Sequence, residues 1–164
     1  AFTDVAREHS NAYLLIVGDG PMRNQLESLC EHLSITSQVI FTGYKPKPLG
    51  YLQIMDAYLL SSLSEGTSMT LLEAMSFAKP CVVTDAGGNA EIVEHGVTGF
   101  VTPNDTQAPF AQAMASVMTG GEQTNHFGER AHQRFHSIFS VSSMVSSYEI
   151  LYEKLSDQTR GSAS

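Results

Sequence analysis

One stretch of the sequence, residues 59–88, constrains the fold more than any other. It opens at the end of the apolar run Ala57–Leu60, which is typical of a buried strand. Polar residues follow, and then an apolar segment of good helix formers, 69–78, which Pro80 ends. Cys81–Val83 is a second short apolar run. A strand, a helix and a strand in this order predict a parallel βαβ unit.

The start of the predicted helix has the properties of an anion site. Thr67 or Ser68 can cap it by accepting a backbone N–H. The unpaired N–H groups and the positive dipole end of a helix attract phosphate. Glu65 lies at the carboxyl end of the preceding strand, where open α/β sheets bind ligands, and Glu73 lies one and a half turns into the helix. Two carboxylates beside an anion site favour a ligand that also carries hydroxyl groups, because a carboxylate accepts paired hydrogen bonds from a diol.

This pattern resembles the Glu-x7-Glu signature of retaining nucleotide-sugar glycosyltransferases of the group 1 family, which have the two Rossmann-like domains of the GT-B architecture. The resemblance covers residues 1–155 and is much more specific than two glutamates alone. The segments that carry it are Val17–Pro21, Ser64–Gly66, Leu71–Met75, Lys79–Asp85, Gly87–Val93 and Gly96–Val101. It implies the C-terminal, donor-binding domain of an enzyme that moves a sugar from a nucleotide diphosphate sugar to an acceptor such as a glycan or a lipid-linked saccharide.

The resemblance also implies roles for individual residues. Glu73 is expected to accept hydrogen bonds from the ribose hydroxyls, while Glu65, the catalytic candidate, lies by the sugar and helps to place the ring. Backbone N–H groups and the helix dipole are expected to bind the sugar hydroxyls and the distal phosphate; these donor-binding residues are Gly66, Thr67, Ser68, Met69 and Thr70. This chain has Gly-Thr-Ser after Glu65 where the family usually has Gly-Phe-Gly.

Tyr44 and Lys45 follow another predicted strand end. The resemblance implies that the backbone there meets the base of the nucleotide. A solvent-exposed loop closed by Pro46 and Pro48 is the alternative interpretation.

Strands and helices alternate along the whole chain. The expected strands are Tyr13–Val17, Val39–Phe41, Ala57–Leu60, Cys81–Val83 and Thr98–Val101. The expected helices are 1–8, 21–33, 49–55, 69–78, 91–95, 107–118, 127–139 and 142–155. This alternation predicts an α/β fold, a Rossmann-like parallel sheet with helices on both faces. Residues 1–157 are expected to form one nucleotide-sugar-binding domain and residues 158–164 a flexible tail.

By resemblance, the family's first strand, an Arg- and Lys-bearing loop that holds the diphosphate, and an N-terminal acceptor-binding domain lie upstream of residue 1. We therefore expect an N-terminally truncated domain without its first strand, which is inactive in transfer on its own. Peripheral membrane association would require the missing domain.

Composition and charge limit the partners. The chain is 42% hydrophobic and 16% charged, which indicates a globular protein. A net charge of −8 argues against nucleic acid or an anionic membrane as the main partner, because both need basic patches. No apolar run approaches the ~20 residues of a membrane span, and no signal peptide is recognisable within the sequence. Cys30 and Cys81 lie in apolar contexts, which favours a reduced pair and a cytoplasmic location.

We expect neither a metal nor a cofactor beyond a UDP- or GDP-type donor, with mainly electrostatic stabilisation of the leaving group. His132 and His136, with Glu129 one turn earlier, have the spacing of a metal pair, but an exposed polar helix face is favoured. Gly18–Gly20 matches part of a dinucleotide fingerprint, and a tight turn is the favoured interpretation. Open alternatives are a sugar-nucleotide epimerase, a non-catalytic nucleotide- or sugar-binding module, and a receiver domain phosphorylated on Asp85.

Overall fold

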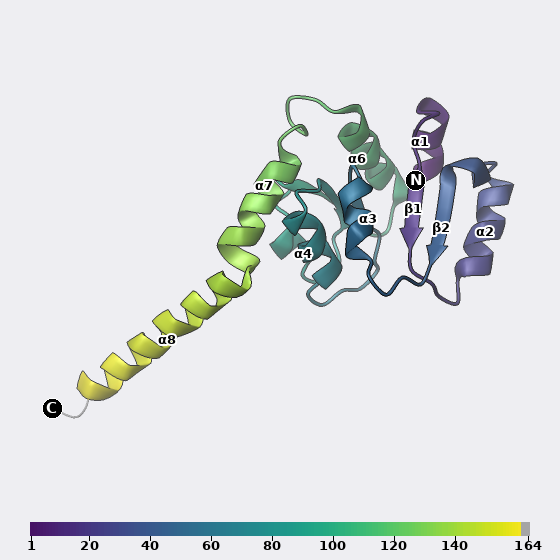
Figure 1. Cartoon of the computed structure of the whole chain (residues 1–164). Helices are drawn as coiled ribbons and strands as arrows, with labels where there is room; N and C mark the ends of the chain where they lie inside the picture. Colours follow the sequence, from purple (N-terminus) through teal and green to yellow (C-terminus); the bar gives the residue numbers. More distant parts are fainter. Residues whose placement is uncertain (162–164) are drawn as a thin grey trace.

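The chain folds into alternating strands and helices around two short parallel sheets (Figure 1). The structure is a computed structural model that describes the backbone of residues 1–161 and the side chains of residues 1–156. The strands are β1 (Leu14–Val17), β2 (Val39–Gly43), β3 (Tyr58–Leu60), β4 (Cys81–Thr84) and β5 (Gly99–Thr102). The helices are α1 (Phe2–Glu8), α2 (Arg23–His32), α3 (Leu49–Ile54), α4 (Met69–Ser76), α5 (Asn89–Ile92), α6 (Gln107–Thr119), α7 (Phe127–Arg134) and α8 (Val141–Gly161), with a 3-10 turn at Thr36–Gln38 and a π-helical turn at Phe135–Phe139.

The five strands do not form one continuous sheet. β1 pairs with β2 in one sheet, and β4 lies between β3 and β5 in the other, with every pair parallel. Figure 1 shows β1, rather than β2, on the side of the three-stranded sheet. This arrangement matches the doubly wound order 3-2-1-4-5-6 without its strand 1. The predicted α/β class, with parallel strands flanked by helices, is therefore confirmed.

Two clusters of buried side chains hold the elements together. The first joins α1 and α6 to apolar residues of both sheets and so connects the two sheets; it includes Phe2, Val5, Val39, Val82 and Phe110. The second lies on the opposite face of the three-stranded sheet, with α3, α4 and α7; it includes Leu52, Leu71, Met75, Val83 and Ala131. Val82 belongs to the first cluster and Val83 to the second, because successive side chains of a strand point to opposite faces.

Several helix boundaries differ from the sequence-based expectation. α2 begins at Arg23 instead of at residue 21, because the Arg23 N–H donates to the Gly20 carbonyl at 3.1 Å and closes a turn first. The helix expected over 127–139 is α-helical to Arg134 and then becomes the π-helical turn.

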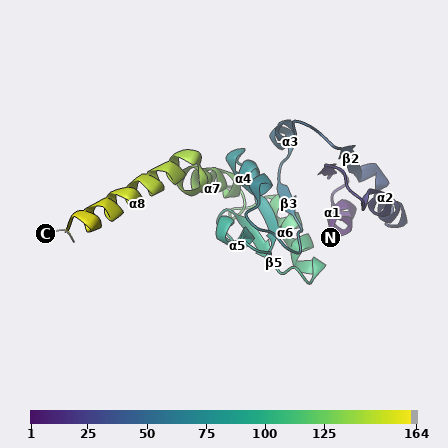
Figure 2. The same ribbon diagram turned by 90° about the horizontal axis from the view of Figure 1, so that it is seen from below.

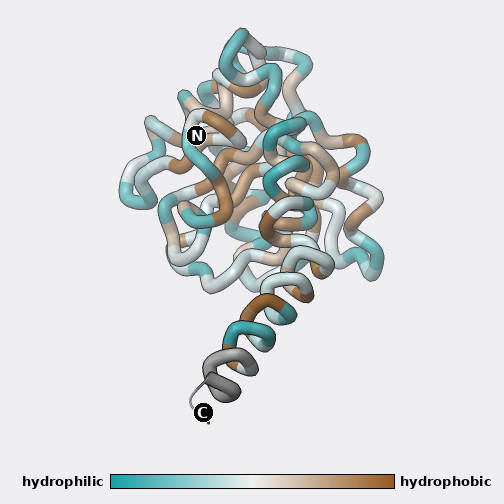
Figure 3. Tube along the Cα trace, turned by 90° about the vertical axis from the view of Figure 1, so that its left-hand side faces the viewer, coloured by the Kyte–Doolittle hydropathy of each residue, from teal (hydrophilic) through white to brown (hydrophobic). Residues whose placement is uncertain are grey.

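α8 projects from the rest of the molecule in two perpendicular views (Figures 1 and 2). Its backbone is helical to Gly161, inside the segment expected to be a tail, and residues 162–164 lie outside the described residues. Figure 3 shows hydrophobic positions along this helix interspersed with hydrophilic ones, and Val141, Tyr148 and Tyr152 are exposed. In the described part of the chain, no helix combines the length and apolarity needed to cross a bilayer.

Candidate functional site

Glu65 lies in the loop between β3 and α4 and is half-buried. Its carboxylate accepts a hydrogen bond from the Ser62 hydroxyl, with 2.6 Å between Oγ and Oε1. Ser62 was not among the site residues predicted from the sequence. A hydroxyl three residues before a site carboxylate is the local signal that could have identified it.

The N-terminus of α4 has the geometry expected of an anion site. Ser68 is the N-cap, and its Oγ accepts the Leu71 N–H at 3.4 Å. The N–H groups of Met69 and Thr70 stand at the first two positions of the helix, where no intrahelical acceptor exists for them. Gly66, Thr67, Met69 and Thr70 are exposed, so a ligand can reach this backbone.

Glu73 is the fifth residue of α4 and is half-buried. Its carbonyl accepts the Ser76 hydroxyl at 2.6 Å. Among the residues that the structure describes, its carboxylate has no hydrogen-bond or ion-pair partner, whereas Glu65 has Ser62. The Glu73 carboxylate is therefore the one whose accepting capacity is available to a ligand.

Tyr58, the first residue of β3, connects that strand to the first turn of α4. Its hydroxyl donates to Thr70 Oγ1 at 2.7 Å. Burial raises the pKa of Tyr58; the Thr70 hydrogen bond opposes this rise, and the charges of Cys81, Glu65 and Glu73 raise the pKa further. Both predicted glutamates therefore lie within electrostatic range of a single hydroxyl. Sequence reasoning missed Tyr58 because it begins a short apolar strand and carries no motif signal.

Tyr44 and Lys45 follow β2, in the other sheet. They come directly after Gly43, the last residue of β2, and so lie at the carboxyl end of that strand. The arrows of β1 and β2 point to the same, lower edge of Figure 1. Tyr44 is 76% exposed and Lys45 is half-buried. Among the described residues, no side-chain hydrogen bond or ion pair connects either of them to Glu65, Glu73 or α4.

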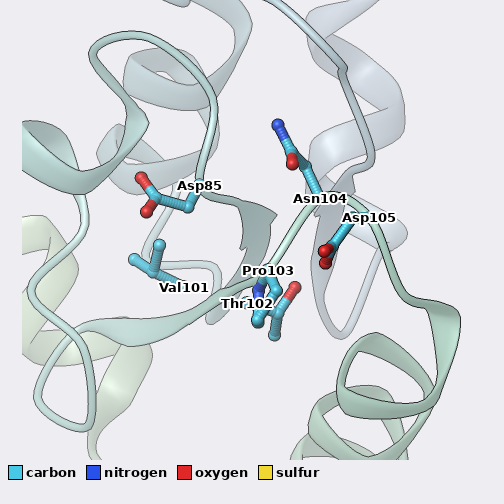
Figure 4. Close-up of a pocket in the computed structure, with 6 residues that line it drawn as sticks. All are labelled: Asp85, Val101, Thr102, Pro103, Asn104 and Asp105. Atoms are coloured by element: carbon cyan, nitrogen blue, oxygen red, sulfur yellow. The ribbon is translucent and has the colours of Figure 1, made fainter.

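A cavity of about 350 Å³ opens where β4 and β5 end (Figure 4). It is lined by Asp85, Val101, Thr102, Pro103, Asn104 and Asp105. Figure 4 shows Asp85 and Asn104 entering from two separate segments, one after each strand. Two carboxylates disfavour a diphosphate here, whereas carboxylate and amide groups suit ligand hydroxyls. Of the two carboxylates, only Asp85 was a candidate from the sequence, because the fold is what brings Asp105 to the same cavity.

The histidine pair lies elsewhere. His132 Nδ1 is 2.8 Å from the Ser76 carbonyl oxygen, and the rings of His132 and His136 meet edge to face with centroids 4.4 Å apart. Within the part of the chain that the structure describes, no three His, Cys, Asp or Glu side chains cluster in a way that could hold a metal ion.

Residues 1–134 match the family of glycosyl transferases group 1. The chain is 33% identical over 162 residues to N-acetyl-alpha-D-glucosaminyl L-malate synthase of Bacillus anthracis, covering 98% of this chain and 42% of that protein. It is 32% identical over 163 residues to O-antigen chain mannosyltransferase C of Escherichia coli, covering 92% of this chain and again 42% of the relative. The chain thus spans less than half the length of these curated relatives.

Solved structures agree with this likeness. HepE of Anabaena in complex with UDP superposes with a TM-score of 0.80 and 25% identity, over 94% of this chain and 44% of that one. The C-terminal domain of a glycosyl transferase group 1 family protein, LpcC of Francisella tularensis, has the same fold with a TM-score of 0.77 and 16% identity, over 85% of this chain and 75% of that one. A family match across most of the chain and a shared GT-B fold lead to one conclusion: the chain belongs to the glycosyl transferases group 1 family.

Proposed function

We propose that this chain is the donor-binding half of a retaining glycosyltransferase, which moves a sugar from a nucleotide diphosphate sugar to an acceptor such as a glycan or a lipid-linked saccharide. The observation that carries the proposal is the capped N-terminus of α4 with two half-buried carboxylates beside it. Free helix N–H groups suit phosphate, and carboxylates suit the hydroxyls of ribose and sugar. A nucleotide diphosphate sugar carries all of these groups.

The two carboxylates have different roles in this proposal. Glu73, whose carboxylate is unpaired within the described residues, accepts the two ribose hydroxyls. Glu65, held by Ser62, faces the sugar and places the ring for attack. The N–H groups from Gly66 to Thr70 and the α4 dipole stabilise charge on the diphosphate as the bond to the sugar breaks.

UDP is the first nucleotide to test, because HepE was solved with UDP and with UDP-glucose at 25% identity to this chain. The relatives are named for N-acetylglucosaminyl and mannosyl transfer, so sugars differ among them. GDP and GDP-mannose therefore form the second pair of probes. We expect affinities weaker than micromolar, because strong diphosphate binding needs cationic partners, and no hydrogen bond or ion pair brings a Lys or Arg to the start of α4 within the described residues.

The test is isothermal titration of the chain and two variants, Glu73→Gln and Glu65→Gln, with UDP and UDP-glucose. Glu73→Gln keeps the shape of the side chain but loses the charge, so it should cost about 1.5–3 kcal/mol with both ligands. Glu65→Gln should leave UDP affinity nearly unchanged and weaken UDP-glucose alone. Glu31→Gln is the matched control, because Glu31 is an exposed glutamate of α2.

The proposal fails if Glu65→Gln and Glu73→Gln weaken UDP equally, or if neither variant differs from Glu31→Gln. Either result would make these glutamates structural carboxylates at a helix start. The same variants in the longer enzyme test the catalytic role, because a contact that tightens in the transition state lowers kcat more than it raises KM.

A further inference from the structure

The end of β4 and the turn after it, residues 84–88, contact the loop between β3 and α4 that carries Glu65 (the Glu65 loop) at three points. The Thr84 hydroxyl donates to the Ser62 carbonyl at 2.6 Å and also lies 3.3 Å from the Leu60 carbonyl. The Gly88 N–H donates to the Gly66 carbonyl at 3.3 Å. Between these two contacts, Gly87 packs directly on the Glu65 backbone. The loop is thereby attached to a neighbouring strand on both sides of its carboxylate.

Gly87 permits this approach for two reasons. Its φ of +53° is one that side-chain-bearing residues rarely adopt, and a Cβ atom at this position would overlap the Glu65 carbonyl oxygen. A Cβ atom at Gly88 would lie 3.0 Å from the Gly66 carbonyl oxygen. The glycines therefore let two backbones touch where a larger residue would push the Glu65 loop outward.

The turn itself is firmly anchored. Thr84 ends β4, whose four residues are all buried, and the Asp85 N–H donates to the Thr102 carbonyl of β5 at 2.7 Å. Asn89 is completely buried, and its Nδ2 donates to the Thr84 carbonyl at 3.1 Å. Because the turn is fixed to the interior of the sheet, its contacts also restrict the motion of the Glu65 loop, which the loop's own residues could not do alone.

We propose that Ser62, Thr84 and Gly87 are positioning residues that fix the Glu65 carboxylate at the sugar end of the donor. Thr84 orients Ser62 through its carbonyl, Ser62 orients the carboxylate through its hydroxyl, and Gly87 sets how closely the loop approaches the sheet. This inference rests on the function proposed above. It extends that function, because sugar recognition then depends on Thr84 and Gly87 at the end of β4, about twenty positions along the chain from the Glu65 loop.

The experiment compares isosteric pairs. Thr84→Val removes the hydroxyl and keeps the shape, Thr84→Ser keeps the hydroxyl, and Ser62→Ala removes the donor to Glu65. Thr98→Val is the matched control, because Thr98 is also a buried threonine, and its Oγ1 bonds Glu94 backbone groups away from the Glu65 loop. Each variant is titrated with UDP and with UDP-glucose, its thermal unfolding is recorded, and the ¹³C shifts of the Glu65 and Glu73 carboxylates are compared by NMR.

We expect Ser62→Ala and Thr84→Val to leave UDP affinity within about twofold and to weaken UDP-glucose by roughly two- to tenfold, the value of one net hydrogen bond. In these two variants the ¹³C chemical shift of the Glu65 carboxylate should change, while that of Glu73 stays the same. Thr84→Ser, which keeps the hydroxyl, should have the UDP-glucose affinity and the Glu65 chemical shift of the unmodified chain. Thr98→Val should lower stability without changing the ratio of the two affinities. In a Glu65→Gln background, Ser62→Ala should add nothing further, because the hydrogen bond acts through that carboxylate.

The outcomes separate the two proposals. The first case is that the ratio of UDP-glucose affinity to UDP affinity changes in Glu65→Gln but not in Ser62→Ala or Thr84→Val. This result would overturn the positioning inference and leave the proposed function intact. A ratio that does not change in Glu65→Gln would overturn the proposed role of Glu65, and the positioning inference with it. Equal weakening of UDP and UDP-glucose in all variants, Thr98→Val included, would mean that the network only stabilises the fold.

Discussion

The two sheets of this molecule are built from the same kind of strand but differ in burial. β4 has a partner on each side, and all four of its residues are buried. β1 has one partner, and all four of its residues are only half-buried. Around the smaller sheet, Leu26, Leu29 and Ile40 are also exposed. Parallel strands are stable when both edges and both faces are covered, so we expect the three-stranded sheet to contribute most of the folding free energy.

The largest expected effect is on the three-stranded side. Leu71→Ala removes a completely buried side chain from the cluster under α4, so it should lower the free energy of unfolding by about 2–5 kcal/mol. Urea unfolding followed by circular dichroism measures this loss. A loss below about 1 kcal/mol would mean that this sheet is no better packed than the other. It would contradict the expected difference in stability between the two sheets.

A middle-sized effect is expected in thiol reactivity, since each sheet region contains one buried free cysteine. Burial raises the pKa of Cys81 to about 12, so its thiolate is scarce at pH 8 until β4 is opened. Burial and the charge of Glu27 also raise the pKa of Cys30, but Cys30 lies on α2 beside the two-stranded sheet. Labelling should be at least about tenfold faster at Cys30, which corresponds to about 1.4 kcal/mol.

The single variants Cys30→Ala and Cys81→Ala assign the two labelling phases. Equal rates at both thiols would show that the sheets open together, as one cooperative unit. Raising the pH from 8 towards 10 should speed labelling at both sites, because the reactive thiolate becomes more abundant in each.

The smallest effect is expected from Leu29→Ala on α2. Leu29 is 49% exposed, so its truncation should cost less than about 1 kcal/mol, against the larger loss for a leucine of the same size in α4. Leu29→Ala and Leu71→Ala remove the same atoms from an exposed and from a buried position, so they compare the packing around the two sheets. A cost for Leu29→Ala that matches Leu71→Ala would mean that α2 is held more tightly than its exposure indicates.

Local sequence patterns were sufficient to predict those secondary-structure elements that are determined by residues close to one another in the sequence. The apolar run around Val82 and the Ser68 cap depend on near neighbours, and both are present in the structure. The expected helix over 69–78 ends earlier, at Ser76, because Ala78 has a left-handed φ of +55° that a helix does not continue. The later start of α2 was missed, because Pro21 is acceptable both at the first position of a helix and in the turn that precedes it.

The contacts that organise the candidate site could not be predicted in the same way. The Thr84 hydroxyl bonds the Ser62 carbonyl across 22 residues, and Gly87 touches Glu65 at the same distance along the chain. Such contacts depend on which strand connections lie side by side, which periodicity does not specify. The family resemblance indicated the two glutamates, but Tyr58 carries no motif of its own, and the only local signal for Ser62 is its hydroxyl three residues before Glu65.

α8 gives the molecule an unusual hydrodynamic shape. Its 21 residues extend about 31 Å at ~1.5 Å per residue. A compact chain of 164 residues has a radius of gyration near 15 Å, so the projecting helix is about twice as long as that radius. In small-angle X-ray scattering, the pair-distance distribution of such a molecule has a main peak from the globular part and a long tail at large distances, to which few atom pairs contribute. Its end-over-end rotation in solution is slower than the rotation of a sphere of equal mass.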